Sequence, residues 1–377
     1  MVLLEELVEE VLLRLPPSEP ACIVRAALVC KPWCRLVSAP RFRRRFRDLH
    51  GAPPVLGVLC NLSVWDDGGR FATRLIPTSP ACPRRDDLLF CHALDARHGR
   101  VLLGGVPSYP GADPLEAGRH LAVWDPVTYG LRALPPALAD CKAAVACAAG
   151  DGCDHLDCHS GPFVVVALGG FEPEDIWLCV YSSEADSWSE PTYLSRAPVY
   201  GVSCQPAALV GNTLYFAIDG SRILRYDLAT REASVIYLPE TCGYGNRLMT
   251  LEDGAVGVAR VDSDRDARLS LCLWSMEASP NGDIGWTKIR VIELNKLLPV
   301  DELLITPNSL VGFAHGIGVF FIKANDRLFM IDLKSGKVKM VCKGSHFYTV
   351  VPYTSFYTPA LGSVTIGETS GVDASIG

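Results

Sequence analysis

The hydrophobic and polar positions of residues 3–15 repeat with the period of an α-helix. The apolar positions fall on one face and the glutamates on the other: Leu4, Leu7, Val8, Val11, Leu12 and Leu15 against Glu5, Glu6, Glu9 and Glu10. Pro16-Pro17 ends this helix, because proline cannot continue the hydrogen-bond ladder. Further helices are predicted after Ser18, after Pro32 and across the basic segment 41–50, which Gly51 closes.

Residues 1–50 therefore form a small helical unit of three or four helices. A unit of this size is too small to bury both faces of every helix. We expect another protein or another part of the chain to cover its remaining apolar stripe.

After Gly51 the pattern changes to short apolar, β-branched and aromatic runs between Gly, Pro, Asp and Asn, which is typical of an all-β fold. A strand–turn–strand unit recurs from residues 122, 179, 224, 271 and 329, so successive units start 57, 45, 47 and 58 residues apart. This spacing is close to that of propeller blades. Residues 51–358 divide into six units of roughly 51 residues, with five or seven also possible. A strand near 55–60 should pair with the C-terminal strands to close the ring, and residues 359–377 are expected to be a flexible tail.

Composition excludes several classes of function. The chain has 377 residues, 49% of them hydrophobic, and a net charge of −7. Residues 1–50 hold nine Lys and Arg against six Asp and Glu, whereas the remainder holds 26 against 36, so the main body is acidic. An acidic body disfavours nucleic acid as a partner. The acidic start and the lack of a long apolar segment predict no signal peptide and no membrane contact. We therefore expect a cytoplasmic or nuclear protein in which most of the fifteen cysteines stay reduced.

The sequence offers candidate metal ligands but no catalytic motif. Cys30 and Cys34 lack the spacing of a zinc or redox pair. A second group has zinc-ligand chemistry, with Cys147 and Asp157 nearby: Cys153, His155, Cys158 and His159. Its spacing matches none of the ordinary zinc frameworks, so we expect a loop between strands and no bound metal or cofactor. The sequence indicates that the protein is not an enzyme.

The arginines of the fourth predicted helix could contact phosphate: Arg41, Arg43, Arg44, Arg45 and Arg47. They lack the mixed Asn, Gln and Arg face that reads bases. A solvated or partner-facing surface is the favoured interpretation.

Residues 3–46 resemble an F-box. The similarity rests on an acidic-apolar helix that ends in Leu-Pro-Pro, a Val-Cys-Lys-x-Trp core and a Pro-Arg-Phe exit. The resemblance implies docking on a Skp-type adaptor and, through it, on a cullin. The positions that match the docking segments of the family are Leu3, Leu7, Val11, Leu12, Leu15, Pro16, Val29, Cys30, Trp33 and Leu36. The family usually begins with Leu-Pro, whereas Leu4 follows Leu3 here.

The β region resembles the kelch-like or F-box-associated propellers of plant F-box proteins. Leu-Gly-Gly-Phe at 168–171, followed by Tyr181 and Trp188, has the order of a kelch unit. The two resemblances together imply the substrate-recognition subunit of a Skp–cullin–F-box ubiquitin ligase that presents an unknown protein substrate on the propeller. The alternative is an F-box scaffold, or a propeller that senses a small molecule or metal, outside any ligase.

Substrate contacts are expected on blade loops. The candidate loops are 106–119, 150–162 and 240–247. Their candidate residues are Tyr109, Arg119, Tyr244 and Arg247.

Overall fold

The structure is a computed structural model of the chain. It describes residues 5–64, 70–80, 82–83, 88–89, 91–105, 120–138, 141–149, 153–155, 158, 161–170, 176–195, 205–239, 245–263, 269–278, 284–298, 306, 309–344 and 347–356. The expected tail at 359–377 lies outside these residues.

Four helices form an N-terminal unit, the helical module of residues 5–50. They are α1 (Glu5–Leu13), α2 (Pro20–Val29), α3 (Lys31–Ser38) and α4 (Pro40–His50). A proline stands in the first turn of α2, α3 and α4, where its missing N–H costs no hydrogen bond. Gly51 ends α4 with a φ of 72°, a conformation that glycine adopts readily.

The helical module has one small core of its own. Its buried members come from all four helices: Val8, Leu12, Leu13, Ile23, Ala26, Ala27, Val37, Phe42 and Phe46. The rings of Phe42 and Phe46 lie 6.0 Å apart, and both are almost completely buried. The predicted helical unit is therefore present, with four helices.

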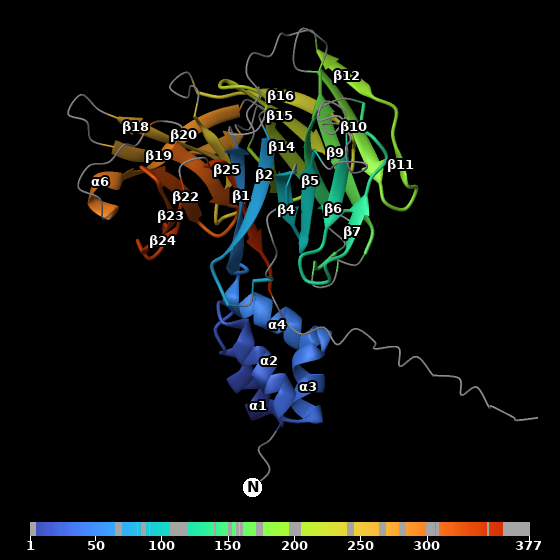
Figure 1. Ribbon diagram of the computed structural model, residues 1–377, viewed down its shortest axis with the longest axis vertical. Helices are drawn as coiled ribbons and strands as arrows, with labels where there is room; N and C mark the ends of the chain where they lie inside the picture. Colours follow the sequence, from blue (N-terminus) through green and yellow to red (C-terminus); the bar gives the residue numbers. More distant parts are fainter. Residues whose placement is uncertain are drawn as a thin grey trace, which may run out of the picture.

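The rest of the chain forms six antiparallel sheets, the blades of a propeller (Figure 1). Blade 1 combines β25 (Phe347–Thr354), β1 (Val55–Val64), β2 (Arg70–Pro77) and β3 (Leu88–Leu89). Blade 2 holds β4 (His92–Arg97), β5 (Arg100–Gly104), β6 (Leu121–Trp124) and β7 (Leu131–Ala133). Blade 3 holds β8 (Cys141–Cys147), β9 (Phe163–Gly169), β10 (Ile176–Ser182), β11 (Ser187–Trp188) and β12 (Thr192–Ser195).

The remaining blades follow in chain order. Blade 4 holds β13 (Ala208–Val210), β14 (Thr213–Ala217), β15 (Arg222–Asp227) and β16 (Ala233–Tyr237). Blade 5 holds β17 (Arg247–Thr250), β18 (Val256–Ser263), β19 (Leu269–Ala278) and β20 (Ile284–Glu293), and the short helix α6 (Leu294–Leu297) follows it. Blade 6 holds β21 (Leu310–Ala314), β22 (Val319–Ala324), β23 (Arg327–Asp332) and β24 (Val338–Lys343).

The prediction of six blades and of their closure is confirmed. β25 pairs antiparallel with β1, from Val55 opposite Thr354 to Leu62 opposite Phe347. Blade 1 thus takes one strand from the C-terminal end of the ring and three from its start. This pairing joins the two ends of the ring and leaves no open edge between the first and last blades.

The buried apolar side chains of the ring lie between blades rather than at one centre. Among the described residues they form six clusters, each shared by two neighbouring blades. Leu102 and Val123 of blade 2, for example, pack against Val145 and Val165 of blade 3. Each blade therefore covers the apolar faces of its neighbours.

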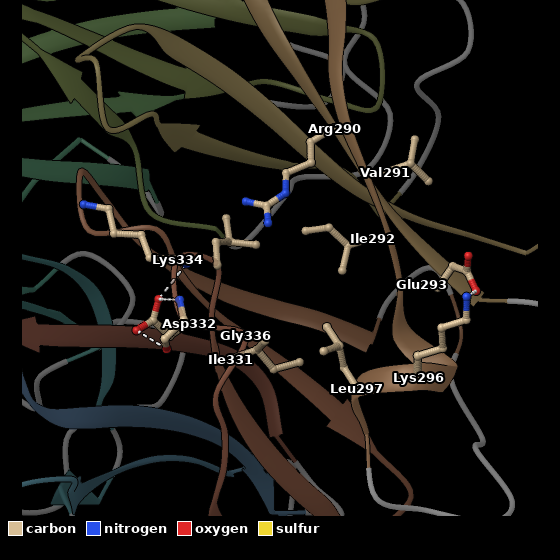
Figure 2. A pocket seen from close by; sticks show the side chains of 12 residues that line it. Arg290, Val291, Ile292, Glu293, Lys296, Leu297, Ile331, Asp332, Lys334 and Gly336 are labelled. Atoms are coloured by element: carbon tan, nitrogen blue, oxygen red, sulfur yellow. Dashed lines mark hydrogen bonds and ion pairs between the residues drawn. The ribbon is translucent and has the colours of Figure 1, made fainter.

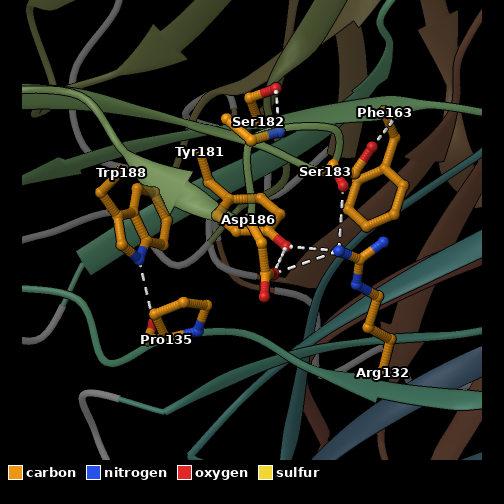
Figure 3. A network of polar contacts seen from close by, with 9 residues as sticks. Arg132, Pro135, Phe163, Tyr181, Ser182, Ser183, Asp186 and Trp188 are labelled. Atoms are coloured by element: carbon orange, nitrogen blue, oxygen red, sulfur yellow. Dashed lines mark hydrogen bonds and ion pairs between the residues drawn. The ribbon is translucent and has the colours of Figure 1, made fainter.

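Polar contacts also join blades 2 and 3 (Figure 3). The Trp188 indole N–H donates to the Pro135 carbonyl at 2.9 Å. The Tyr181 hydroxyl donates to Asp186 at 2.6 Å and accepts from the Arg132 guanidinium at 3.0 Å. The kelch-like order seen in the sequence thus corresponds to a structural contact between blades.

The helical module sits below one face of the ring, with α4 nearest to the blades (Figure 1). The Phe46 ring meets the Phe356 ring with centroids 6.2 Å apart, and the Ser79 hydroxyl donates to the Ser18 carbonyl at 3.3 Å. Asp154, in the connection between β8 and β9, contacts Arg44 of α4 at 3.3 Å. This face of the ring is called the module face below.

Candidate functional site

The helical module carries apolar side chains that the described residues leave more than half exposed. Leu7 and Val11 on α1 are 53% and 62% exposed, and Leu28 and Val29 at the end of α2 are 79% and 64% exposed. Cys30 and Pro16 are also exposed. We call Leu7, Val11, Leu28 and Val29 the apolar surface of the module. Exposed aliphatic side chains on neighbouring helices are the kind of surface that packs into a partner's groove.

The other predicted adaptor contacts lie deeper. Leu15, Trp33 and Leu36 are half-buried and pack against the module's core, so each presents only part of its side chain. Leu12 is 3% exposed and belongs to that core, one helical turn after Val8. It therefore offers no surface to a partner. Leu3 lies outside the described residues.

Leu28 is the most exposed of these side chains, and the sequence reasoning did not name it. The signal was present in the run Ala-Ala-Leu-Val-Cys at 26–30. Ala26 and Ala27 face the core, so the next two positions along α2 turn away from it.

Several arginines of α4 make contacts within the chain, and the expected solvated or partner-facing surface is limited to the exposed ones, Arg41 and Arg44. Arg45 pairs with Glu9 at 2.6 Å and with Glu10 at 2.5 Å, and so joins α4 to α1. Arg43 is buried, and Arg47 donates to the Asp154 carbonyl. Arg41 remains exposed.

A group of sulfur and nitrogen atoms meets on the module face. Cys147 at the end of β8 lies beside three residues of the following connection: Cys153, His155 and Cys158. The Sγ atoms of the cysteines and a ring nitrogen of His155 all lie within 4.8 Å of one another. Cys158 Sγ is 3.4 Å from His155 Nδ1. These residues are called the Cys/His cluster below.

The cluster differs from the group expected from the sequence. Three of its members were expected there as ligands and Cys147 only as a neighbour, but Cys147 joins them at the end of a strand, and His159 lies outside the described residues. Cys147 and Cys158 are buried, Cys153 is half-buried and His155 is exposed. Burial raises the pKa of the Cys158 thiol to about 12, and the neighbouring thiols Cys147 and Cys153 add to this.

Blade 2 supports the cluster from the side. The Arg100 guanidinium donates to the carbonyls of Cys158 and Gly161, which fixes both ends of this short segment. The His98 ring stacks on the His155 ring with centroids 3.9 Å apart and planes 6° apart. The cluster is thus held by the neighbouring blade as well as by its own.

Only parts of the predicted substrate loops belong to the described residues, and these parts lie at both ends of the ring. Residues 106–119, with Tyr109 and Arg119, lie outside the described residues, as does Tyr244. β5 and β6, which flank 106–119, meet at the end of blade 2 away from the module, and Arg247 opens the inner strand β17 at that same end. The described parts of 150–162 belong instead to the module face.

Polar side chains lie inside the ring. Asp95 accepts from Arg97 Nε and from the Val145 N–H, each at 3.0 Å, and burial raises the pKa of Asp95. His315 Nδ1 accepts the Thr250 N–H at 3.2 Å, and burial followed by the charge of Arg97 lowers the pKa of His315 to about 3. The Asp95–Val145 contact joins blades 2 and 3 and the Thr250–His315 contact joins blades 5 and 6, so both are structural cross-links.

A groove of about 460 Å³ lies between β20 and α6 on the blade 5 side and the end of β23 with the turn that follows it in blade 6 (Figure 2). Its polar groups largely bind one another: Lys296 pairs with Glu293 at 2.8 Å, and Asp332 accepts the backbone N–H groups of Lys334 and Ser335. The groove therefore lacks the converging free polar groups of a ligand pocket.

No helix among the described residues is both long and apolar enough to cross a membrane. A search of curated proteins found no match. Among solved structures, the WD40 domain of SCAP from fission yeast is similar at 15% identity and a TM-score of 0.35, over 69% of this chain and 52% of that one. The chain thus spans about half of that structure.

Two family models match. The F-box domain matches residues 3–45, which include the helical module's exposed apolar side chains. The model described as "F-box protein AT5G49610-like, beta-propeller" matches residues 94–361, which run from blade 2 through the closing strand β25. The chain therefore belongs to the F-box proteins with an AT5G49610-like β-propeller.

Proposed function

We propose that this protein is the substrate-recognition subunit of a Skp–cullin–F-box ubiquitin ligase. The helical module would dock on a Skp-type adaptor, and the adaptor would connect the protein to a cullin. The propeller would hold a target protein. Such a subunit is expected in the cytoplasm or the nucleus, where these ligases act.

The apolar surface of the module is the observation that carries this proposal. Leu7, Val11, Leu28 and Val29 are each more than half exposed, although the module's core is small. Burying apolar area stabilises by about 25 cal/mol per Å², so covering such side chains favours association. α4 faces the ring, whereas α1 lies on the side of the module away from it (Figure 1). A partner could therefore reach α1 without displacing the propeller.

The face of the ring opposite the module would serve the substrate. It is separated from the module by the full length of the blades. A protein bound there would be held near the ubiquitin-carrying enzyme, which raises the effective concentration of its lysines. The protein would then contribute proximity and orientation rather than catalysis.

The test is co-expression of the full chain with a Skp-type adaptor, followed by size-exclusion chromatography and titration. The variant Leu28→Asp/Val29→Asp places two charges on the most exposed part of the apolar surface. We expect it to weaken adaptor binding at least tenfold, because a charge buried without a partner costs several kcal/mol. Val235→Asp is the matched control, since Val235 is a 39% exposed valine on β16 of the propeller.

Adaptor binding by the wild type and by Val235→Asp, and its loss in the double variant, would support the proposal. Equal binding by all three chains would contradict it. Adding the cullin to the purified complex tests whether the adaptor connects this protein to the cullin. A complex that binds the adaptor but excludes the cullin would favour a scaffold acting outside a ligase.

A further inference from the structure

We propose that the Cys/His cluster is a structural zinc site in which Cys147, Cys153, His155 and Cys158 bind one Zn²⁺. Three thiolates and one imidazole form a Cys₃His set, one of the common ligand sets of structural zinc. The ligands follow the spacing Cys-x5-Cys-x-His-x2-Cys. This spacing differs from that of ordinary zinc frameworks, so only the fold identifies the site.

The distances fit a tetrahedral cation. Zn–S bonds of about 2.3 Å and Zn–N bonds of about 2.0–2.1 Å set neighbouring ligand atoms roughly 3.5–3.8 Å apart. All four ligand atoms already lie within 4.8 Å of one another, and Cys158 Sγ and His155 Nδ1 are 3.4 Å apart. Small side-chain rotations would therefore complete the coordination shell.

The ligand types select the metal. Thiolate and imidazole ligands suit zinc, whereas Mg²⁺ and Ca²⁺ require oxygen ligands. Four protein ligands fill the tetrahedral positions of zinc and leave none open to water or substrate. Such a closed site stabilises structure and does no chemistry.

The site lies where it can stabilise the junction between ring and module. Asp154 stands between two of the ligands, Cys153 and His155. Its carboxylate pairs with Arg44 at 3.3 Å, and its carbonyl accepts from Arg47, both on α4. A cation bound by the residues before and after Asp154 would hold Asp154 in this position. Zinc would thus help to fix the helical module relative to the propeller.

The first measurement is the metal content of the full chain. The chain is purified under reducing conditions, without chelator, from cells supplied with zinc, and metals are quantified by mass spectrometry. We expect about one zinc per chain. Replacement by Co²⁺ should give the visible absorption of a tetrahedral ion bound by thiolates. X-ray absorption should show three sulfur neighbours and one nitrogen neighbour.

Two variants and a control make the test specific. Cys153→Ser/His155→Ala removes the two ligands that are not fully buried, so the fold should survive. It should lose at least 90% of the zinc. Cys153→His exchanges one zinc ligand for another and should retain the metal. Cys179→Ala is the control, because Cys179 is a buried cysteine of β10 in the same blade but outside the cluster; its zinc content should match the wild type.

Two results would overturn the proposal. One is a folded wild-type chain with far less than one zinc, whether its cluster cysteines are free thiols or a disulfide by thiol counting. The other is unchanged zinc content in Cys153→Ser/His155→Ala. The role at the junction has its own readout: removing zinc with a chelator should accelerate hydrogen exchange in α4. Unchanged exchange there would overturn that role.

Discussion

The helical module and the propeller bury their apolar side chains in different ways. In the ring, every blade covers the apolar faces of its two neighbours, and the pairing of β25 with β1 closes the circle. The helical module has a single core of nine buried apolar residues and leaves five large aliphatic side chains exposed, four of them on α1 and α2 and the fifth, Leu49, on α4. The blades bury their apolar faces against one another around a closed ring, whereas the module's small core leaves aliphatic side chains of α1 and α2 available to a partner.

This difference explains why a partner-binding surface can be recognised on the helical module from its exposed apolar side chains. A surface made for another protein must keep apolar side chains in water until the partner arrives, which costs stability in the free protein. That cost is visible on α1 and α2 at Leu7, Val11, Leu28 and Val29. The buried residues of the propeller show only how the blades pack against one another. The following variants test whether the two regions are independent and how much each contact contributes.

Phe46→Ala should have the largest effect. Phe46 is 1% exposed in the module's core, and its ring centroid lies 4.4 Å from that of His50. Truncating a buried phenylalanine costs about 3–5 kcal/mol. For a core this small the loss approaches the whole stability of the unit. Hydrogen exchange should therefore show residues 5–50 unfolded, adaptor binding lost and the blades still protected. Loss of protection in the blades as well would show that the two regions fold as one.

Leu59→Ala is the matching variant in the ring. Leu59 is fully buried on β1, opposite Val351 of the closing strand β25. The lost burial and the cavity together should cost about 2–5 kcal/mol. Denaturant unfolding followed by exchange in blade peptides would measure it. We expect faster exchange in blades 1 and 2, whose shared cluster contains Leu59, and an unchanged helical module, so equal destabilisation of both regions would contradict the comparison.

The sequence predicted the helical module more sharply than the ring. Prolines at the starts of α2, α3 and α4 and the glycine after α4 mark helix ends through local backbone chemistry, which needs no knowledge of the fold. The blade count followed from a loose repeat. Closure between β1 and β25 followed from the general cost of an open sheet edge.

Contacts between distant residues were beyond the reach of sequence patterns. Leu12 and Leu28 both occupy apolar positions of helices, and only packing shows that Leu12 is buried while Leu28 is exposed. The Cys/His cluster required Cys147, whose position depends on where β8 ends. The arginines of α4 looked like one basic surface, yet Arg45 and Arg47 bind different parts of the chain.

Lowering the pH should weaken the ring through His315. Burial, together with Arg97, lowers the pKa of His315 to about 3, against about 6.5 in an unfolded chain. The unfolded chain therefore takes up this proton first, so the stabilisation is complete above pH 6.5 and declines as the pH falls toward 3. Protonated Nδ1 could no longer accept the Thr250 N–H.

The measurement is denaturant unfolding of the wild type and His315→Asn between pH 7.5 and 5, above the range in which most carboxylates titrate. Asparagine keeps an oxygen acceptor for Thr250 but does not titrate. We expect stability to fall more steeply with decreasing pH in the wild type than in His315→Asn. Parallel slopes would show that His315 does not control this range.

Arg45→Gln should have the smallest effect, and only in the helical module. Arg45 pairs with Glu9 and Glu10 of α1, but its side chain is 40% exposed, so water and salt weaken the attraction. Exchange of residues 5–50 should be slightly faster in the variant at low ionic strength. The difference should shrink as salt is added, because screening removes the same interaction from the wild type. A large, salt-independent change would show instead that the guanidinium packs as part of the α1–α4 contact, and the module's stability would then depend on that contact as well as on its apolar core.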